Sequence, residues 1–99
     1  MNRIRLHAKV VEHSALRYTP AGIPVAELKL QHQGAVVEAG MERQLDFECA
    51  AVAVGPVAQT LSRVALGSTI EIDGFIAPVS RRGQRLRIHI TSYREISGV

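Results

Sequence analysis

Residues 68–91 read STIEIDGFIAPVSRRGQRLRIHIT, and this stretch decides the fold of the chain. Apolar and polar side chains alternate in residues 68–76 and again in residues 85–91, which is the period of a half-buried strand. The connection between these two segments contains two adjacent arginines followed by a glycine. The stretch therefore predicts a β-hairpin, continuing to about residue 96, whose turn carries a movable cluster of positive charge on a rigid base.

The rest of the chain supplies the other elements. The same alternation predicts three earlier strands, over residues 2–12, 23–33 and 43–54. Residues 34–42 have no period, and we expect them to form a loop longer than an ordinary hairpin turn. A short helix is predicted over residues 57–66, because Pro56 suits the first turn of a helix and Gly67 suits its C-terminal cap.

The order of elements indicates the fold class. Three strands, a short helix and two strands is the order of the OB-fold, a five-stranded Greek-key barrel. With 99 residues and 46% hydrophobic side chains, the chain can bury one modest core. We therefore expect an all-β (mainly β) barrel that forms a single domain over residues 1–99. Gly74, inside a predicted strand, is expected to mark a bulge or a corner of that barrel.

Charge is unevenly distributed along the chain. Twelve basic and nine acidic side chains give a net charge of only +3. Residues 81–99, however, hold five arginines and one glutamate, whereas residues 34–54 hold one arginine and four carboxylates. Ten of the twelve basic residues are arginine, which favours bidentate phosphate contacts and stacking. The pattern favours a polyanionic partner near the C-terminal hairpin.

No pattern in the sequence predicts catalysis or metal binding. The four histidines are scattered, and the single cysteine, Cys49, has no base near it in the sequence and is expected to be a small buried hydrophobe. The sequence contains no phosphate-binding or dinucleotide-binding glycine motif. We therefore expect no catalytic residue, no metal and no cofactor. The start of the chain does not resemble a signal peptide, and no apolar run is long enough to span a membrane, so we expect a reduced, cytoplasmic setting.

The hairpin turn is the candidate nucleic-acid site. Its candidate contacts are Arg81, Arg82, Arg85 and Arg87, the last of which shares a strand face with His89. Single-strand binding normally adds aromatic stacking. The chain has no Trp; we expect Tyr18 and Phe75 to be exposed candidates and Phe47 to be buried. Binding should therefore depend on charge more than on stacking, and strongly on salt.

Several stretches resemble a known family. They are Asn2-Arg3, Leu16-Arg17-Tyr18-Thr19-Pro20-Ala21-Gly22-Ile23-Pro24, Glu38-Ala39-Gly40 and residues 67–76. Together these stretches, which cover nearly the whole chain, resemble primosomal replication protein N, a bacterial OB-fold family related to single-stranded DNA-binding protein.

The resemblance implies a homodimer that binds single-stranded DNA, has no catalytic activity and works with the restart helicase. It also implies DNA contacts from the loop after the first strand, where Arg17 lies, and from the hairpin that holds the candidate arginines. Where family members carry aromatic contacts in the long loop and at the start of the third strand, this chain has Met41 and Asp46.

Two other functions and one assembly state follow from the residues. The chain could be a protein-binding OB module whose basic hairpin contacts an acidic partner, or a small enzyme using the carboxylates of the third and fourth strands.

Arg3, Arg5, His7 and Lys9 should form a basic outer face on the first strand, and that strand has no preceding element to cover its edge. A bare edge invites pairing with a second copy, so we expect a twofold homodimer that joins two basic hairpins.

Overall fold

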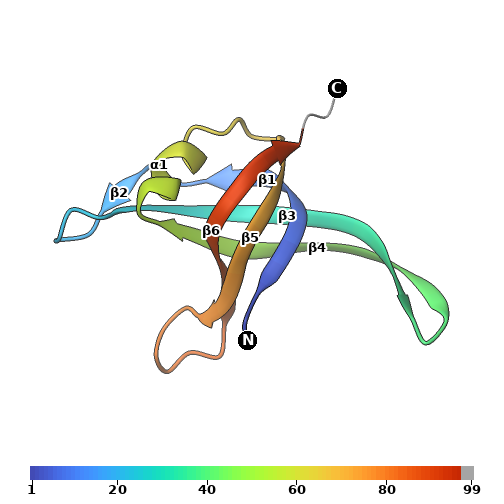
Figure 1. Cartoon of the computed structure of the whole chain (residues 1–99). Helices are drawn as coiled ribbons and strands as arrows, with labels where there is room; N and C mark the ends of the chain where they lie inside the picture. Colours follow the sequence, from blue (N-terminus) through green and yellow to red (C-terminus); the bar gives the residue numbers. More distant parts are fainter. Residues whose placement is uncertain (97–99) are drawn as a thin grey trace.

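The computed structural model describes residues 1–96; residues 97–99, which belong to the predicted domain, lie outside the described residues. Its elements are β1 (Ile4–His13), β2 (Arg17–Tyr18), β3 (Pro24–Glu38), β4 (Met41–Val54), α1 (Pro56–Leu61), β5 (Thr69–Pro78) and β6 (Leu86–Ile96) (Figure 1). The strands are hydrogen-bonded in the order β1-β5-β6-β4-β3-β2, and an additional β1–β3 pairing closes the barrel. β4 and β6 run parallel, and the other pairs are antiparallel. The predicted OB-fold, with one helix before the last two strands, is confirmed.

The barrel interior is filled by the inward positions of the alternating strands. Val10, Leu30, Ile70 and Ile72 are fully buried. Leu61 of α1 joins the same cluster. Burying each such aliphatic side chain contributes about 1.5–3 kcal/mol, so this shared interior is the main stabilising feature of the fold.

The helix is shorter than predicted. α1 ends at Leu61, and the N–H groups of Arg63 and Val64 then donate to carbonyl groups only three residues back, at 3.1 Å each. This tighter winding ends the α-helix although Val64 still packs in the core. Gly67 does not cap the helix: with φ of +88°, it turns the chain toward β5, and its N–H donates to the Val10 carbonyl at 2.8 Å.

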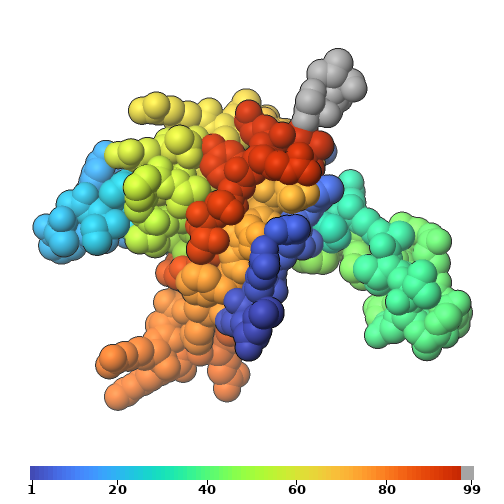
Figure 2. All heavy atoms as spheres, viewed as in Figure 1, coloured from blue at the N-terminus to red at the C-terminus, as the bar shows by residue number. Residues whose placement is uncertain are grey.

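The prediction of a loop over residues 34–42 is wrong. β3 and β4 pair continuously as far as Glu38 opposite Met41, so the turn consists only of Ala39 and Gly40. Both turn residues have positive φ, 53° and 76°, which is the requirement of a tight type I′ hairpin turn. The far end of this hairpin, residues 33–46, projects from the barrel as an arm (Figures 1 and 2). An arm outside the core has no buried face, and the sequence there consequently shows no apolar alternation.

Gly74 behaves as predicted. The β5–β6 register shifts between Asp73 and Gly74, and a Cβ at Gly74 would lie 1.9 Å from the carbonyl oxygen of His89. Only glycine permits this close approach of two backbones. The bulge bends the hairpin so that its lower part, with the turn, extends away from the barrel (Figure 1).

Candidate nucleic-acid interface

A groove of about 440 Å³ lies beside the turn of the β5–β6 hairpin. It is lined by the end of β1, the first half of β3, the second half of β4 and the residues around Arg85–Arg87. The turn itself, residues 79–85, is called the basic loop below, and it projects from the barrel on the side away from the C-terminus (Figure 2). The groove and the loop together form an open surface on which an extended chain can lie.

The basic loop carries the free cations of this surface. The Val79 N–H donates to the Arg85 carbonyl at 2.9 Å, which closes the base of the loop. Arg81, Arg82 and Arg85 are exposed, and within residues 1–96 none of them has a carboxylate oxygen within 4.0 Å. Their guanidinium groups are therefore available for phosphate.

The other two predicted arginines are already paired. An Nη2–H of Arg17, on β2, donates to Oε1 of Glu27 on β3 at 3.0 Å. The Nη1 of Arg87, on β6, lies 3.7 Å from the same oxygen, and its side chain is only 22% exposed. Arg17 and Arg87 thus meet at one carboxylate in the groove, a pairing that strand alternation alone does not reveal.

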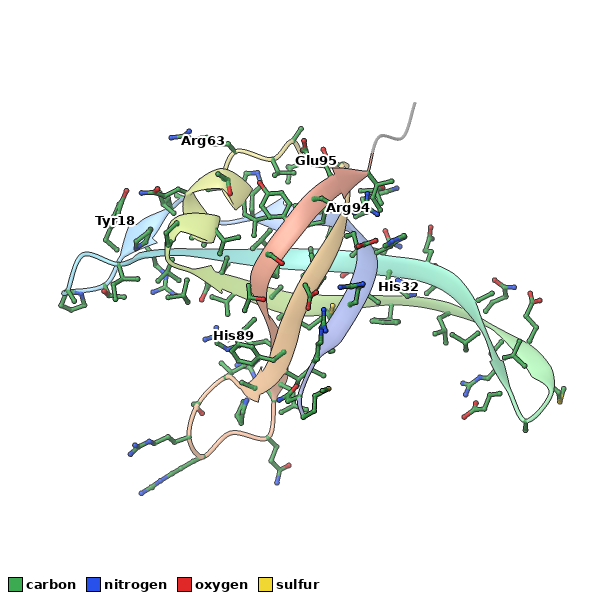
Figure 3. All side chains as sticks on the ribbon, viewed as in Figure 1. Tyr18, His32, Arg63, His89, Arg94 and Glu95 are labelled. Carbon is green, nitrogen blue, oxygen red and sulfur yellow. The ribbon has the colours of Figure 1, made fainter. Side chains whose placement is uncertain are left out.

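The two candidate aromatic residues differ in exposure. Tyr18 is 58% exposed and points away from the ribbon at β2, as predicted (Figure 3). The expectation of an exposed Phe75 is wrong: it is only partly exposed and stacks on His89, with ring centroids 4.7 Å apart and an interplanar angle of 12°. The bulge brings Phe75 opposite His89, which covers one face of the ring. Burial, and then the nearby charge of Arg87, lower the pKa of His89.

The prediction that Phe47 is buried is also wrong. Phe47 is 42% exposed, because β4 has already left the closed part of the barrel, and its ring packs against His32 at 5.3 Å. Its neighbour Asp46 faces the opposite side of β4 and accepts hydrogen bonds from the side chains of Gln31 and Gln33, at 3.1 Å each. These two bonds lower the pKa of Asp46. A carboxylate therefore stands where the resemblance places an aromatic contact.

The basic outer face predicted for the first strand is partly neutralised, because Arg3, Arg5 and His7 have carboxylate partners whereas Lys9 has none within 4.0 Å in the described residues. Arg3, just before β1, and Arg5 of β1 both donate to Asp73 of β5, at 2.8 and 3.1 Å to the same oxygen. These bonds lower the pKa of Asp73 to about 2. Glu71 similarly accepts from Arg94 at 3.0 Å and lies 2.7 Å from His7.

The sequence-level excess of arginine after residue 80 is therefore not one patch. Arg94 lies at the end of β6 far from the basic loop, beside Glu95, and faces its own carboxylate partner (Figure 3). Among the described arginines without a carboxylate within 4.0 Å, three lie in the basic loop and Arg63 lies elsewhere.

A second, apolar opening was not foreseen from the sequence. It has a volume of about 290 Å³ and lies between the first half of β1, the middle of β4 and the lower part of the hairpin. Its apolar lining includes Ile4, Leu6, Phe47, Cys49, Ile76 and Leu86. Cys49 is half-buried there rather than fully buried, and burial raises the pKa of its thiol. The sequence contained one sign of this opening. The alternation of apolar residues in the hairpin continues to Ile76 and Leu86, beyond the part of the hairpin that lies in the closed barrel.

The edge of β1 beside this opening is partly bare. Residues 4–9 pair with β5 on one side, whereas on the other side β3 pairs only from Lys9 onward. The carbonyl of His7 meets the Nδ1 of His32 at 2.7 Å. Within the described residues, the rest of this edge, Ile4–Ala8, has no strand partner.

Among residues 1–96, no three His, Cys, Asp or Glu side chains are grouped so that they could hold a metal ion. None of the helices in that part of the chain has the length and apolar character needed to cross a membrane.

Comparison with known proteins adds sequence and fold relatives. Residues 2–92 match the model of a family described as another single-strand binding protein family. The chain is 40% identical to the replication restart protein PriB of Bordetella pertussis, over 99% of this chain and 92% of that protein. The solved structure of PriB from Ralstonia solanacearum superposes with a TM-score of 0.87 at 36% identity, covering 96% of this chain and 97% of that one. A single-stranded DNA binding protein from Thermus aquaticus has a TM-score of 0.78 at 21% identity, over 99% of this chain and 51% of that one, and shares the fold.

Proposed function

Since this chain belongs to the single-strand binding protein family, with replication restart proteins PriB among its relatives, we propose that it binds single-stranded DNA in replication restart. The family membership confirms the resemblance that the sequence indicates. The observation that carries the proposal is the basic loop, whose three exposed arginines have no carboxylate partners in the described residues and of which Arg85 lines the groove.

In the proposed complex, phosphates contact the basic loop first. Arg81, Arg82 and Arg85 each offer a planar fork of donors that matches phosphate oxygens. Arg17 and Arg87 lie farther along the surface, and Tyr18 offers one exposed ring on which a base can stack. Phe75 can offer only one ring face, because His89 covers the other. Charge therefore contributes more to this binding than stacking does.

We propose that the chain acts by binding and not by catalysis. A general acid at neutral pH needs a raised carboxyl pKa. Asp46 of β4 and the two carboxylates of β5, Glu71 and Asp73, behave in the opposite way, since hydrogen bonds lower their pKa values. These carboxylates are suited to hold neighbouring side chains, not to transfer protons.

We further propose a homodimer built on the first half of β1. Its bare edge, Ile4–Ala8, can pair with the same edge of a second copy across a twofold axis. The apolar opening beside that edge supplies surface that a second copy would bury. Light scattering at micromolar concentration should give a mass near twice 10.8 kDa. A mass near 10.8 kDa would exclude the dimer at that concentration.

The restart helicase is the proposed protein partner. The support is the resemblance stated above together with the replication restart role in the names of the relatives. Co-sedimentation of the chain with that helicase, with and without oligonucleotide, would test it; no change in either sedimentation boundary would remove this partner from the proposal.

The proposed DNA binding is tested by a fluorescence titration. The probe is labelled oligothymidine of about 16 nucleotides, the upper site size of an OB-fold. We expect binding at about 50 mM salt that weakens steeply by about 200 mM. No binding to oligothymidine at low salt, together with binding to an acidic protein, would support the alternative of a protein-binding OB module.

A further inference from the structure

Glu27, which lines the groove, pairs with Arg17 and Arg87, the two arginines proposed above to contact DNA beyond the basic loop. Its Oε1 accepts a hydrogen bond from Arg17 at 3.0 Å and lies 3.7 Å from Nη1 of Arg87. Three strands, β2, β3 and β6, thus bring two cations to one carboxylate inside the groove. Lys29, one step along the same face of β3, lies 3.9 Å from both Glu12 and Glu48. Arg17, Lys29 and Arg87 therefore each have an internal carboxylate within 4.0 Å, whereas Arg85 at the basic loop has none in the described residues.

The position of Glu27 is fixed by its backbone. Its N–H donates to Oγ of Ser14 at 3.0 Å, and its carbonyl accepts from the N–H of Ser14 at 2.8 Å. The side chain nevertheless remains 49% exposed. Glu27 is therefore an anchored carboxylate that faces solvent in the groove.

Folding stability does not account for this arrangement. Both side chains of the Arg17–Glu27 pair are about half exposed, and such pairs contribute little to the free energy of unfolding, because water screens them and ordering both side chains costs entropy. Arg87 also has a buried Nε for which no partner is present in the described residues. Its guanidinium is thus incompletely bonded by Glu27.

We propose that Glu27 is a built-in competitor for phosphate that limits the affinity of the groove for single-stranded DNA. The inference rests on the proposed function, because it requires the strand to pass through this groove. A phosphate reaching Arg17 or Arg87 must displace the carboxylate, and the freed carboxylate then attracts a cation from solution. That cation uptake offsets counterion release from the strand, so the salt dependence is shallower than the number of groove arginines implies.

The test compares Glu27→Gln with Glu38→Gln. Both changes keep side-chain size and raise the net charge by one. Both also release an arginine, since Glu38 pairs with Arg43 on the arm. Only Glu27, however, lines the groove. Titrations with the labelled oligothymidine should be run at several salt concentrations, with melting curves to show that both variants are folded.

We expect Glu27→Gln to tighten binding about fivefold to tenfold at about 100 mM salt, a tenfold gain being equivalent to about 1.4 kcal/mol. The slope of log affinity against log salt should steepen by about 0.7–1.4, the contribution of one or two added phosphate contacts to a single strand. Glu38→Gln should leave the affinity within about twofold of the parent value, and the slope within about 0.3 of it. Adding Arg17→Ala and Arg87→Ala to Glu27→Gln should remove the gain, which would locate the effect at the two guanidinium groups.

Equal affinity and slope for Glu27→Gln and Glu38→Gln would overturn the proposal. Suppose the two glutamine variants are equal, while the parent protein binds and loses binding when the basic loop is neutralised. Only the role of Glu27 is then refuted, and the proposed function stands. If neither the parent nor any variant binds oligothymidine, the proposed function fails and the competitor role fails with it.

Discussion

Replacing Arg81, Arg82 and Arg85 together with alanine should weaken binding to single-stranded DNA by about tenfold or more at about 50 mM salt, equivalent to about 1.4 kcal/mol or more. The magnitude follows from the structure. All three side chains are exposed, and within residues 1–96 none has a carboxylate within 4.0 Å, so each is free to contact a phosphate.

The same variant should have a shallower salt dependence. Each phosphate contact to a single strand contributes about 0.7 to the slope of log affinity against log salt, so losing three should reduce the slope by about 2. The difference in affinity between variant and parent should consequently narrow toward 200 mM salt. The melting temperature should barely change, because exposed unpaired charges contribute little to folding.

The assay is fluorescence anisotropy with labelled oligothymidine, and its control is the triple variant Arg3→Ala, Arg63→Ala, Arg94→Ala. This control removes the same charge; Arg63 and Arg94 lie at the opposite end of the molecule from the basic loop (Figure 3), and Arg3 is already paired with Asp73 of β5. The control should bind more tightly than the basic-loop variant. A basic-loop variant that binds within about twofold of the parent, or no more weakly than the control, would refute the reasoning.

Three further predictions concern stability and reactivity. Gly74→Ala should lower the free energy of unfolding by about 3 kcal/mol, because its Cβ would lie 1.9 Å from the carbonyl oxygen of His89; Gly34→Ala, which meets only the side chain of His32, is the matched control in chemical denaturation. The ion pairs of Asp73 lower its pKa to about 2, so the stability they contribute is present above about pH 4 and is lost as pH falls toward 2. Melting temperatures between those pH values should fall less steeply in Asp73→Asn than in the parent, and parallel curves would contradict this. Cys49 should react with a thiol reagent much more slowly in the folded than in the unfolded protein, because burial raises its pKa, whereas equal rates would show that the thiol is accessible.

The barrel could be predicted from the sequence because its strands have one buried face. Alternation placed the core at Ala8, Val10, Ile70 and Ile72, and a glycine within that alternation located the bulge. Where a strand leaves the barrel, its side chains no longer need to alternate, so residues 34–42 appeared to be a loop although they form the end of a regular hairpin.

The site was only partly predictable for a different reason. The sequence identifies which residues are cations but not which of them have anionic partners, because the partners of Arg3, Arg17 and Arg87 come from other strands. Exposure of Phe47 likewise depends on where β4 leaves the closed barrel, which no local pattern encodes. The basic loop was identified because its residues are contiguous and its cations have no cross-strand neighbour.

The most direct test of DNA binding at the basic loop is an NMR titration of the labelled protein with oligothymidine, following the arginine Nε–Hε signals and the backbone amides. The account predicts the largest shifts at Arg81, Arg82 and Arg85, smaller ones at Tyr18, and none at Arg94. Largest shifts at Arg63 and Arg94, with the basic loop unchanged, would place the DNA at the opposite end of the molecule and contradict the account.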